Sequence, residues 1–183
     1  EGDTEFCQMA PVIVEDMVYI PGIGGGRNGN AKLMRVPVSE YENREAYEYL
    51  TGYEADGAPV FERGEEALEK ASVFLPGPVG EMSFLYSEYL DEWLVTYLSA
   101  EDLVLRTAKE IWGPYSNPVT IAAQEDYPGL YGAFMDPYYV SADGRKVGFL
   151  MSLWSPASHV AVMEMSLVRA PSSLPIFQKE PRA

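Results

Sequence analysis

Cysteine and histidine are nearly missing from this 183-residue sequence, which contains one of each, Cys7 and His159. A single cysteine excludes an internal disulfide and a cysteine-based metal cluster. A hydrolase triad would need His159 beside an activated nucleophile, and the sequence has no G-x-S-x-G elbow to supply one. We expect Cys7 to be a small core residue and His159 to be a loop residue just before a strand.

Basic residues and long apolar runs are also scarce. Lys and Arg number 13 against 28 Asp and Glu, so the formal net charge is −15. Phosphate binding needs clustered cationic side chains, so we expect no nucleic-acid partner. We expect no membrane span either, because no apolar run approaches the roughly 18 residues that a membrane helix needs. We expect no cofactor, while a Ca²⁺ site built from carboxylates and carbonyls stays open.

Strand-forming residues dominate what is present. Hydrophobic residues make up 47% of the chain and aromatic residues 13%. The segments WLVTYL, LVLRTA and VGFLMSLW are rich in β-branched, aromatic and aliphatic side chains. Helical spacing of apolar residues occurs only within residues 64–74, where we expect one short helix or turn. The sequence therefore predicts an all-β fold.

A unit of strands recurs three times along the chain. Each unit has an apolar strand, a short polar turn, an aromatic-rich strand, a loop and a third strand ending near an arginine. Repeats of this length made of short strands are typical of β-propeller blades. We predict a partial propeller over residues 1–170, with blades around 3–52, 77–123 and 131–170, and a C-terminal tail at 171–183.

About three blades do not close a propeller, which ordinarily has roughly four to eight. An open arrangement would leave an apolar sheet face at each end of the molecule. We therefore expect a partner piece, which is either the missing N-terminal blades or a second copy of the chain.

The repeat also predicts where a site lies, because a propeller gathers equivalent positions of its blades around one axis. The starts of the first strands and the loops from second to third strands share one face. Long or aromatic loops on that face are suited to binding. The residues predicted on that face are Asp3, Glu5, Gln8, Arg27, Glu81, Ser83, Tyr131 and Trp154.

Two of these positions have competing interpretations. Glu81 begins the apolar strand GEMSFLY, where a carboxyl group is a candidate general acid, but it is equally a surface glutamate or one paired with an arginine. Residues 24–29 match G-x-G-x-x-G, yet the residues after them indicate a strand instead of the helix that a dinucleotide site requires. We expect a flexible loop that offers Arg27.

Several strings resemble the DUF4185 family, among them GPVGEMSFLYSEYLDEWLVTYL, YPGLYGAFMDPYYV and GRNGNAKLMRVPVSEYENREAYEYLTG. The resemblance covers nearly all of 6–169. It implies a five-bladed propeller in a secreted or cell-surface protein. For part of the family it implies endo-D-arabinanase activity on arabinan. It further implies an essential acidic residue in the first blade, whereas this chain resembles the family from about the third, and a histidine near Asp136 in many relatives.

We therefore predict a glycosidase-like propeller that acts on an arabinan-type polysaccharide or oligosaccharide with paired carboxylates. The catalytic candidates are Glu81, Asp3 and Glu5, and the substrate-binding candidates are Arg27, Tyr131, Trp154 and Asp136. The alternative is a non-catalytic module that binds a glycan or a protein, which predicts an exposed or salt-bridged Glu81. A purely structural protein would instead have a closed, apolar axis.

Overall fold

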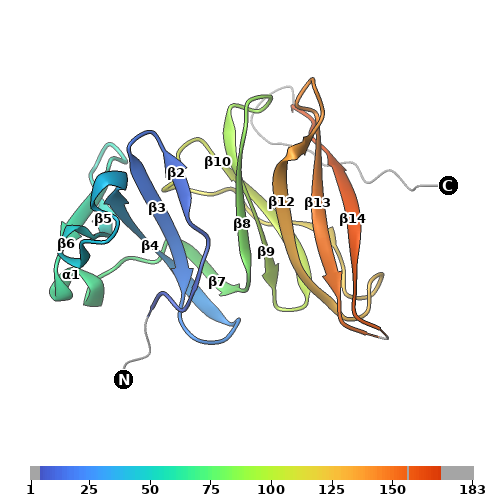
Figure 1. Ribbon diagram of the computed structural model, residues 1–183, viewed down its shortest axis with the longest axis horizontal. Coiled ribbons are helices and arrows are strands. Elements are labelled where there is room, and N and C mark those ends of the chain that lie inside the picture. The colour runs from blue at the N-terminus through green and yellow to red at the C-terminus, as the bar shows by residue number, and fades with distance from the viewer. Residues whose placement is uncertain (1–4, 156, 170–183) are drawn as a thin grey trace.

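The computed structural model describes residues 5–155 and 157–169. Its strands form three antiparallel sheets that stand side by side in chain order along the longest axis of the molecule (Figure 1). The predicted all-β class is therefore confirmed. The three sheets have the arrangement expected of consecutive propeller blades. The predicted tail at 171–183 lies outside the described residues.

The first sheet is the largest, with strands in the order β1-β3-β4-β5-β6, β2 beside β3 and β7 beside β4. These strands are β1 (Gln8–Met9), β2 (Val12–Val14), β3 (Met17–Ile23), β4 (Gly29–Pro37), β5 (Glu48–Tyr53), β6 (Pro59–Arg63) and β7 (Leu75–Val79). The sheet thus extends beyond residue 52, because β6 and β7 also pair with it.

The second and third sheets are simpler meanders. The second has the order β8-β9-β10-β11, with β8 (Met82–Ser87), β9 (Glu92–Ser99), β10 (Asp102–Ala108) and β11 (Val119–Ala122). The third has the order β12-β13-β14, with β12 (Leu130–Val140), β13 (Lys146–Leu153) and β14 (His159–Ser166). His159 is thus the exposed first residue of a strand, not the last residue of a loop.

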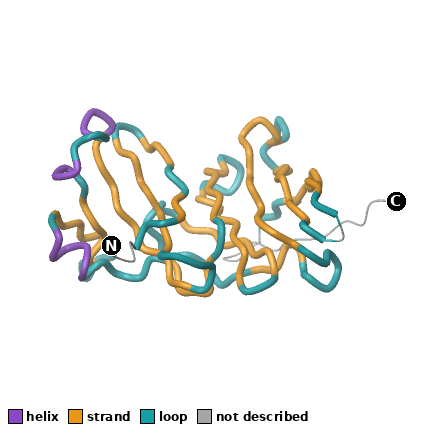
Figure 2. The backbone as a smooth tube through the Cα atoms, turned by 60° about the horizontal axis from the view of Figure 1, so that its bottom comes forward, coloured by secondary structure: helices purple, strands orange, loops and turns teal. Residues whose placement is uncertain are grey.

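Within the described ranges, helical structure is confined to short pieces at the first-sheet end, drawn in purple in Figure 2. The α-helix α1 (Glu65–Glu69) lies within the segment where helical spacing predicted it. Two 3₁₀ turns, η1 (Val38–Glu40) and η2 (Arg44–Ala46), connect β4 to β5. Among the residues that the structure describes, no helix is long and apolar enough to cross a membrane.

The second sheet is buried on both faces, and β9 illustrates why. Leu94 and Leu98 belong to the core shared with the third sheet. Val95 and Tyr97, which alternate with them, belong to the core shared with the first sheet. A strand covered on both faces has no solvent side, so its apolar residues follow one another without a break. The run WLVTYL in the sequence is the result.

Two buried side-chain hydrogen bonds join the second and third sheets. Thr96 Oγ1 donates to the carbonyl oxygen of Ala133 at 2.9 Å. Ser83 Oγ accepts from the backbone nitrogen of Met135, also at 2.9 Å. Thr96 is fully buried and Ser83 nearly so. Ala133 and Met135 lie where β12 shifts register against β13, so the two hydroxyls satisfy backbone groups near an irregular part of that ladder.

The two ends of the molecule are covered differently. Val18 and Ile20, on the far face of the first sheet, are buried beneath Phe6, Ala46 and Tyr47 of the same chain, although Met9 and Ile13 remain exposed. On the far face of the third sheet, Val160 is 60% exposed and Val162 is 61% exposed. The expectation of an apolar face at each end therefore holds in full only for the third sheet.

Cys7 is exposed, so the prediction of a core position is wrong. The physical reason is that Cys7 lies in a bend before β1, where no strand alternation sets which side chain is buried. Its neighbour Phe6 turns inward and packs against Tyr49, with ring centroids 6.0 Å apart. Cys7 then faces the other way, while its backbone nitrogen donates to Ile23 O at 2.8 Å.

The bond between Thr96 and Ala133 yields a test of the contact between the second and third sheets. Thr96→Val keeps the shape of the side chain but leaves a buried carbonyl without its donor, so we expect the free energy of unfolding to fall by about 1 to 2 kcal/mol. Urea unfolding measures it. The matched change Thr120→Val, on an exposed position of β11, should stay within about 0.5 kcal/mol. Equal effects of the two substitutions would contradict this role for Thr96.

Candidate functional site

The candidate site lies at the end of the molecule where the inner strands of the second and third sheets begin. Figure 1 shows the starts of β8 and β12 at its lower end, beside the connections from β3 to β4 and from β13 to β14. Residues from three different sheets therefore reach one region. The starts of the inner strands of different sheets therefore lie near one another, as the repeat predicts.

An ion pair connects the first sheet to the second at this end. Arg27, in the loop between β3 and β4, donates from Nε to Glu81 Oε1 at 2.7 Å. The side chain of Glu81 is 12% exposed and that of Arg27 is 42% exposed. The pair is a short, charge-assisted contact.

The same arginine reaches the third sheet. Its guanidinium carbon lies 4.2 Å from the centroid of the Tyr131 ring, within the range of a cation–π contact. Arg27, Glu81 and Tyr131 were predicted separately from three repeats, and the structure brings them into one cluster. We call these three residues the Arg27 cluster.

The second oxygen of Glu81 is the chemically open group of the cluster. Glu81 Oε2 is buried and has no hydrogen-bond partner within the described chain. Buried carboxylate oxygens are normally satisfied by protein, by ordered water or by a ligand. The oxygen therefore offers a hydrogen-bond acceptor to a molecule that carries a donor.

Gln8, which the repeat predicts on the same face, has a second oxygen of this kind. Its Oε1 is also buried without a partner in the described part of the chain. Gln8 starts β1 opposite Ile23, the last residue before the loop that carries Arg27.

Two glycines determine how the backbone presents these side chains. The nitrogen of Gly80 donates to Leu98 O at 2.7 Å, and a Cβ placed on Gly80 would lie 3.0 Å from Leu98 Cβ. Glu81 is thereby held tightly against β9. Gly132 adopts a positive φ of 66° at the register shift that follows Tyr131. Only glycine adopts that conformation freely, and the bulge sets the direction of Tyr131.

The remaining candidates are engaged in other contacts. Glu5 lies 3.4 Å from Lys32 Nζ and is 46% exposed. Asp136 Oδ1 accepts from the backbone nitrogen of Tyr138 at 2.9 Å, as a turn-forming aspartate does. Trp154 is 66% exposed, and its backbone nitrogen donates to Gly129 O. Asp3 lies outside the described residues.

Carboxylates with a shifted pKa lie elsewhere. At the turn from β8 to β9, Tyr86 donates from its hydroxyl to Asp91 Oδ1 at 2.5 Å. This bond raises the pKa of Tyr86 and lowers the pKa of Asp91, which Lys109 lowers further. Both groups are exposed at the opposite end of the molecule, where they stabilise a tight turn.

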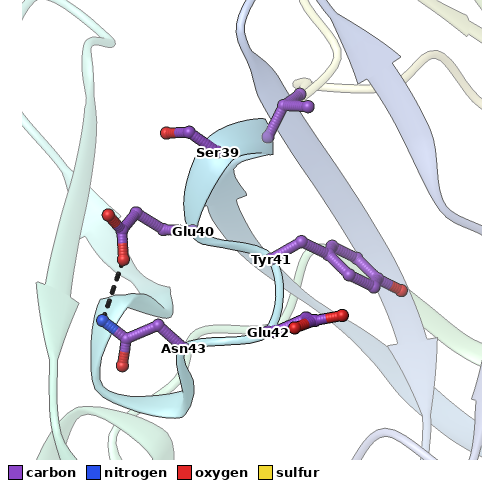
Figure 3. A pocket seen from close by; sticks show the side chains of 6 residues that line it. Ser39, Glu40, Tyr41, Glu42 and Asn43 are labelled. Atoms are coloured by element: carbon purple, nitrogen blue, oxygen red, sulfur yellow. Dashed lines mark hydrogen bonds between the residues drawn. The ribbon is translucent and has the colours of Figure 1, made fainter.

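A surface hollow of about 550 Å³ is formed by residues 38–43. Its side chains do not converge on a common point, as Figure 3 shows, and Glu40 bonds instead to Asn43 at 2.9 Å. The hollow follows the end of β4, whereas Arg27 precedes its start. Across residues 5–155 and 157–169, no group of three or more His, Cys, Asp or Glu side chains is placed to hold a metal ion.

Comparison with known families decides the classification. The model of the DUF4185 family, a domain of unknown function, matches residues 1–166. The chain belongs to the DUF4185 family. The resemblance seen in the sequence is thereby confirmed, and no curated protein matches the chain.

Among solved structures, the DUF4185 chain is similar to the crystal structure of a "putative hydrolase" from Bacteroides ovatus ATCC 8483. The two share 14% sequence identity with a TM-score of 0.53, over 78% of this chain and 37% of that chain. At this identity the likeness shows the fold alone. The chain spans little more than a third of the length of that protein.

The Arg27 cluster predicts a measurable coupling between Arg27 and Glu81. Arg27→Ala leaves a mostly buried carboxylate without its donor, so we expect the free energy of unfolding to fall by about 1 to 2 kcal/mol. In a Glu81→Gln background the same substitution should lower the free energy of unfolding clearly less, which a double-mutant cycle measures. Lys70→Ala, which breaks the exposed pair with Glu66, is the control and should cost no more than about 0.5 kcal/mol. Additive effects of the two substitutions would argue against the pair.

Proposed function

We propose that this DUF4185 chain forms part of a carbohydrate-active, glycosidase-like propeller that acts on an arabinan-type polysaccharide. The observation that carries the proposal is the Arg27 cluster, where a mostly buried carboxylate with one unpaired oxygen lies beside an aromatic ring. A carboxylate oxygen beside a flat apolar surface suits a sugar, which has hydroxyl donors and an apolar ring face.

Glu81 is the candidate for one of the two catalytic carboxyl groups of such a site. Glycoside hydrolysis uses one carboxylic acid to protonate the leaving oxygen and one carboxylate to activate water or to attack the sugar carbon. The support for Glu81 is its buried Oε2, which has no partner in the described chain. The role of general acid that the sequence suggests for Glu81 stays a prediction, and the other carboxyl group is a different residue.

The other residues of the site serve recognition. Tyr131 offers a ring on which a sugar stacks, and Arg27 orients both that ring and the carboxylate. Gln8 Oε1 adds a second buried acceptor on a neighbouring inner strand. Two acceptors favour a neutral, hydroxyl-rich ligand over an anionic one, which would be repelled by the charge of −15 on the chain.

Catalysis needs a second carboxylate. Asp3 and Glu5 remain candidates from this chain, and further blades or a second copy would supply the alternative. A polysaccharide substrate fits a secreted or cell-surface protein. Whichever source supplies the second carboxylate, the proposed chemistry requires no cofactor, since two carboxyl groups and water suffice.

A non-catalytic binding module is the second candidate, and one observation favours it. The ion pair between Arg27 and Glu81 is what a binding module predicts for this glutamate. In that case Glu81 and Gln8 would hold a glycan, or a protein with exposed donors, without turning it over.

Arabinan hydrolysis tests the proposal. Release of reducing ends from arabinan should fall by at least about 100-fold in Glu81→Gln, because the loss of a catalytic carboxyl group removes most of the rate. Binding of an arabinan oligosaccharide, measured by calorimetry, should change only a few-fold. Tyr131→Ala should weaken binding by about fivefold, since one lost aromatic contact is worth roughly 1 kcal/mol.

Glu62→Gln on the exposed end of β6 is the matched control and should change neither quantity. Binding without any release of reducing ends, lost in Tyr131→Ala, would replace the glycosidase with the binding module. Absence of both binding and hydrolysis in a folded protein would overturn both candidates.

A further inference from the structure

The Arg27 cluster has a carboxylate oxygen that a ligand cannot reach in this arrangement. Glu81 Oε2 lacks a hydrogen-bond partner in the described chain and is also buried from solvent. Any further chain around the axis would only add cover to this oxygen. Arg27 is the more exposed partner of the ion pair, and its guanidinium also lies over the Tyr131 ring. A ligand can therefore use Oε2 only after part of the site has moved.

Two of the three residues of the cluster are held in place by strand pairing. Glu81 follows Gly80, whose nitrogen donates to Leu98 O at 2.7 Å. Tyr131 lies in β12 opposite Ser152 of β13. Neither residue can shift far without breaking hydrogen bonds of a sheet that is packed on the core. The part of the site that can move is therefore Arg27.

Arg27 lies in the loop of residues 24–28, which has few other contacts with the body of the molecule. Residues 24–26 are all glycine, and Gly26 has a positive φ of 90° with open space where a Cβ would lie. Across the described ranges, no backbone hydrogen bond outside the strands involves residues 24–28. Glycine leaves the backbone more conformational freedom than other residues do. The side chain of Arg27 therefore fixes the position of this loop.

Both ends of the loop are anchored, which confines a movement to residues 24–28. Ile23, at the end of β3, is fully buried. After the loop, Asn30 Oδ1 accepts from the backbone nitrogen of Gly77 at 2.7 Å. A Cβ on Gly77 would lie 2.5 Å from Gly29 O, so the two backbones are in close contact there. A glycine-rich segment between two fixed ends, closed by one side chain, has the construction of a lid.

We propose that residues 24–28 form a lid over the site, with Arg27 as its latch, and that a ligand binds after the latch has opened. In the closed form Arg27 orients Glu81 and Tyr131 but also occupies them. Opening frees one carboxylate oxygen and one face of the ring, and it returns the guanidinium to solvent. The lid rests on the geometry of the loop, whereas the nature of its ligand rests on the proposed function.

The latch has a defined effect on affinity. An ion pair with a partly exposed partner is only modestly stabilising and is screened by salt, so the closed and open forms exchange. The apparent affinity of a ligand that requires the open form falls in proportion to the fraction of open molecules. Arg27 therefore opposes binding, whereas a residue that contacts the ligand supports it. The sign of the change on removing Arg27 distinguishes the two roles.

Carboxyl labelling of the intact chain tests the lid without any ligand. A water-soluble carbodiimide and an amine modify accessible carboxyl groups, and peptide mass spectrometry gives the rate at Glu81 relative to exposed Glu62. We expect slow labelling of Glu81 that rises with salt, since screening weakens the latch. Arg27→Ala should label Glu81 at least about fivefold faster and lose the salt dependence. Equal rates at Glu81 in the two proteins, or no salt dependence in the intact chain, would overturn the lid.

Arg63→Ala is the matched control. Arg63 pairs with Glu48 at 3.0 Å, with exposed fractions similar to those of the latch, but it lies on β6 at the edge of the first sheet. This substitution should leave the labelling rate of Glu81 unchanged. An equal acceleration in Arg63→Ala would show a general loosening of the chain and would overturn the assignment of Arg27 as the latch.

Calorimetry with an arabinan oligosaccharide tests the effect of the latch on binding. Arg27→Ala should tighten binding by about threefold or more, whereas Arg63→Ala should leave it unchanged. Weaker binding in Arg27→Ala would overturn the inference, because Arg27 would then be a contact of the ligand. If neither protein binds the oligosaccharide, the proposed glycan function fails, and the labelling rates still decide whether the lid exists.

Discussion

Burial of the second sheet on both faces is the constraint on which the rest of this structure depends. β9 alternates between two cores, so the first and third sheets are each fixed against the same strand. The inner strands β8 and β12 then begin side by side at one end of the molecule (Figure 1). Glu81 directly precedes β8 and Tyr131 is the second residue of β12, so their proximity is a consequence of core packing. The site exists because two hydrophobic interfaces place it, not because its polar residues attract one another.

Within that frame, Arg27 sets the chemistry of the site. A glutamate that is 12% exposed loses much of its hydration, a cost that a partner must offset. The guanidinium offsets it through one oxygen only and leaves Oε2 open. Because its Nε is used on Glu81, the flat face of the guanidinium can lie over Tyr131 at 4.2 Å. A lysine would supply the charge but not this combination of in-plane bond and stacking face.

The sequence predicted the fold through features that depend on local chemistry. Continuous apolar runs such as that of β9 revealed strands covered on both sides, and the repeat of these runs revealed three similar sheets. The sequence also predicted that Arg27, Glu81 and Tyr131 share one face. It could not predict that Arg27 bonds to Glu81, because the loop of residues 24–28 has no pattern that sets its direction. Cys7 was misplaced for a related reason, since it lies in a bend before β1, where no periodic pattern sets which side chain faces the core.

The ends of the molecule were the least predictable from sequence. Whether a sheet face is covered depends on segments such as 38–47, whose short turns carry no periodic pattern. The site differs in this respect, because the packing of three sheets fixes where Glu81 and Tyr131 lie. A second carboxylate for the proposed hydrolysis would come from Asp3, from Glu5, from further blades around the axis or from a second copy.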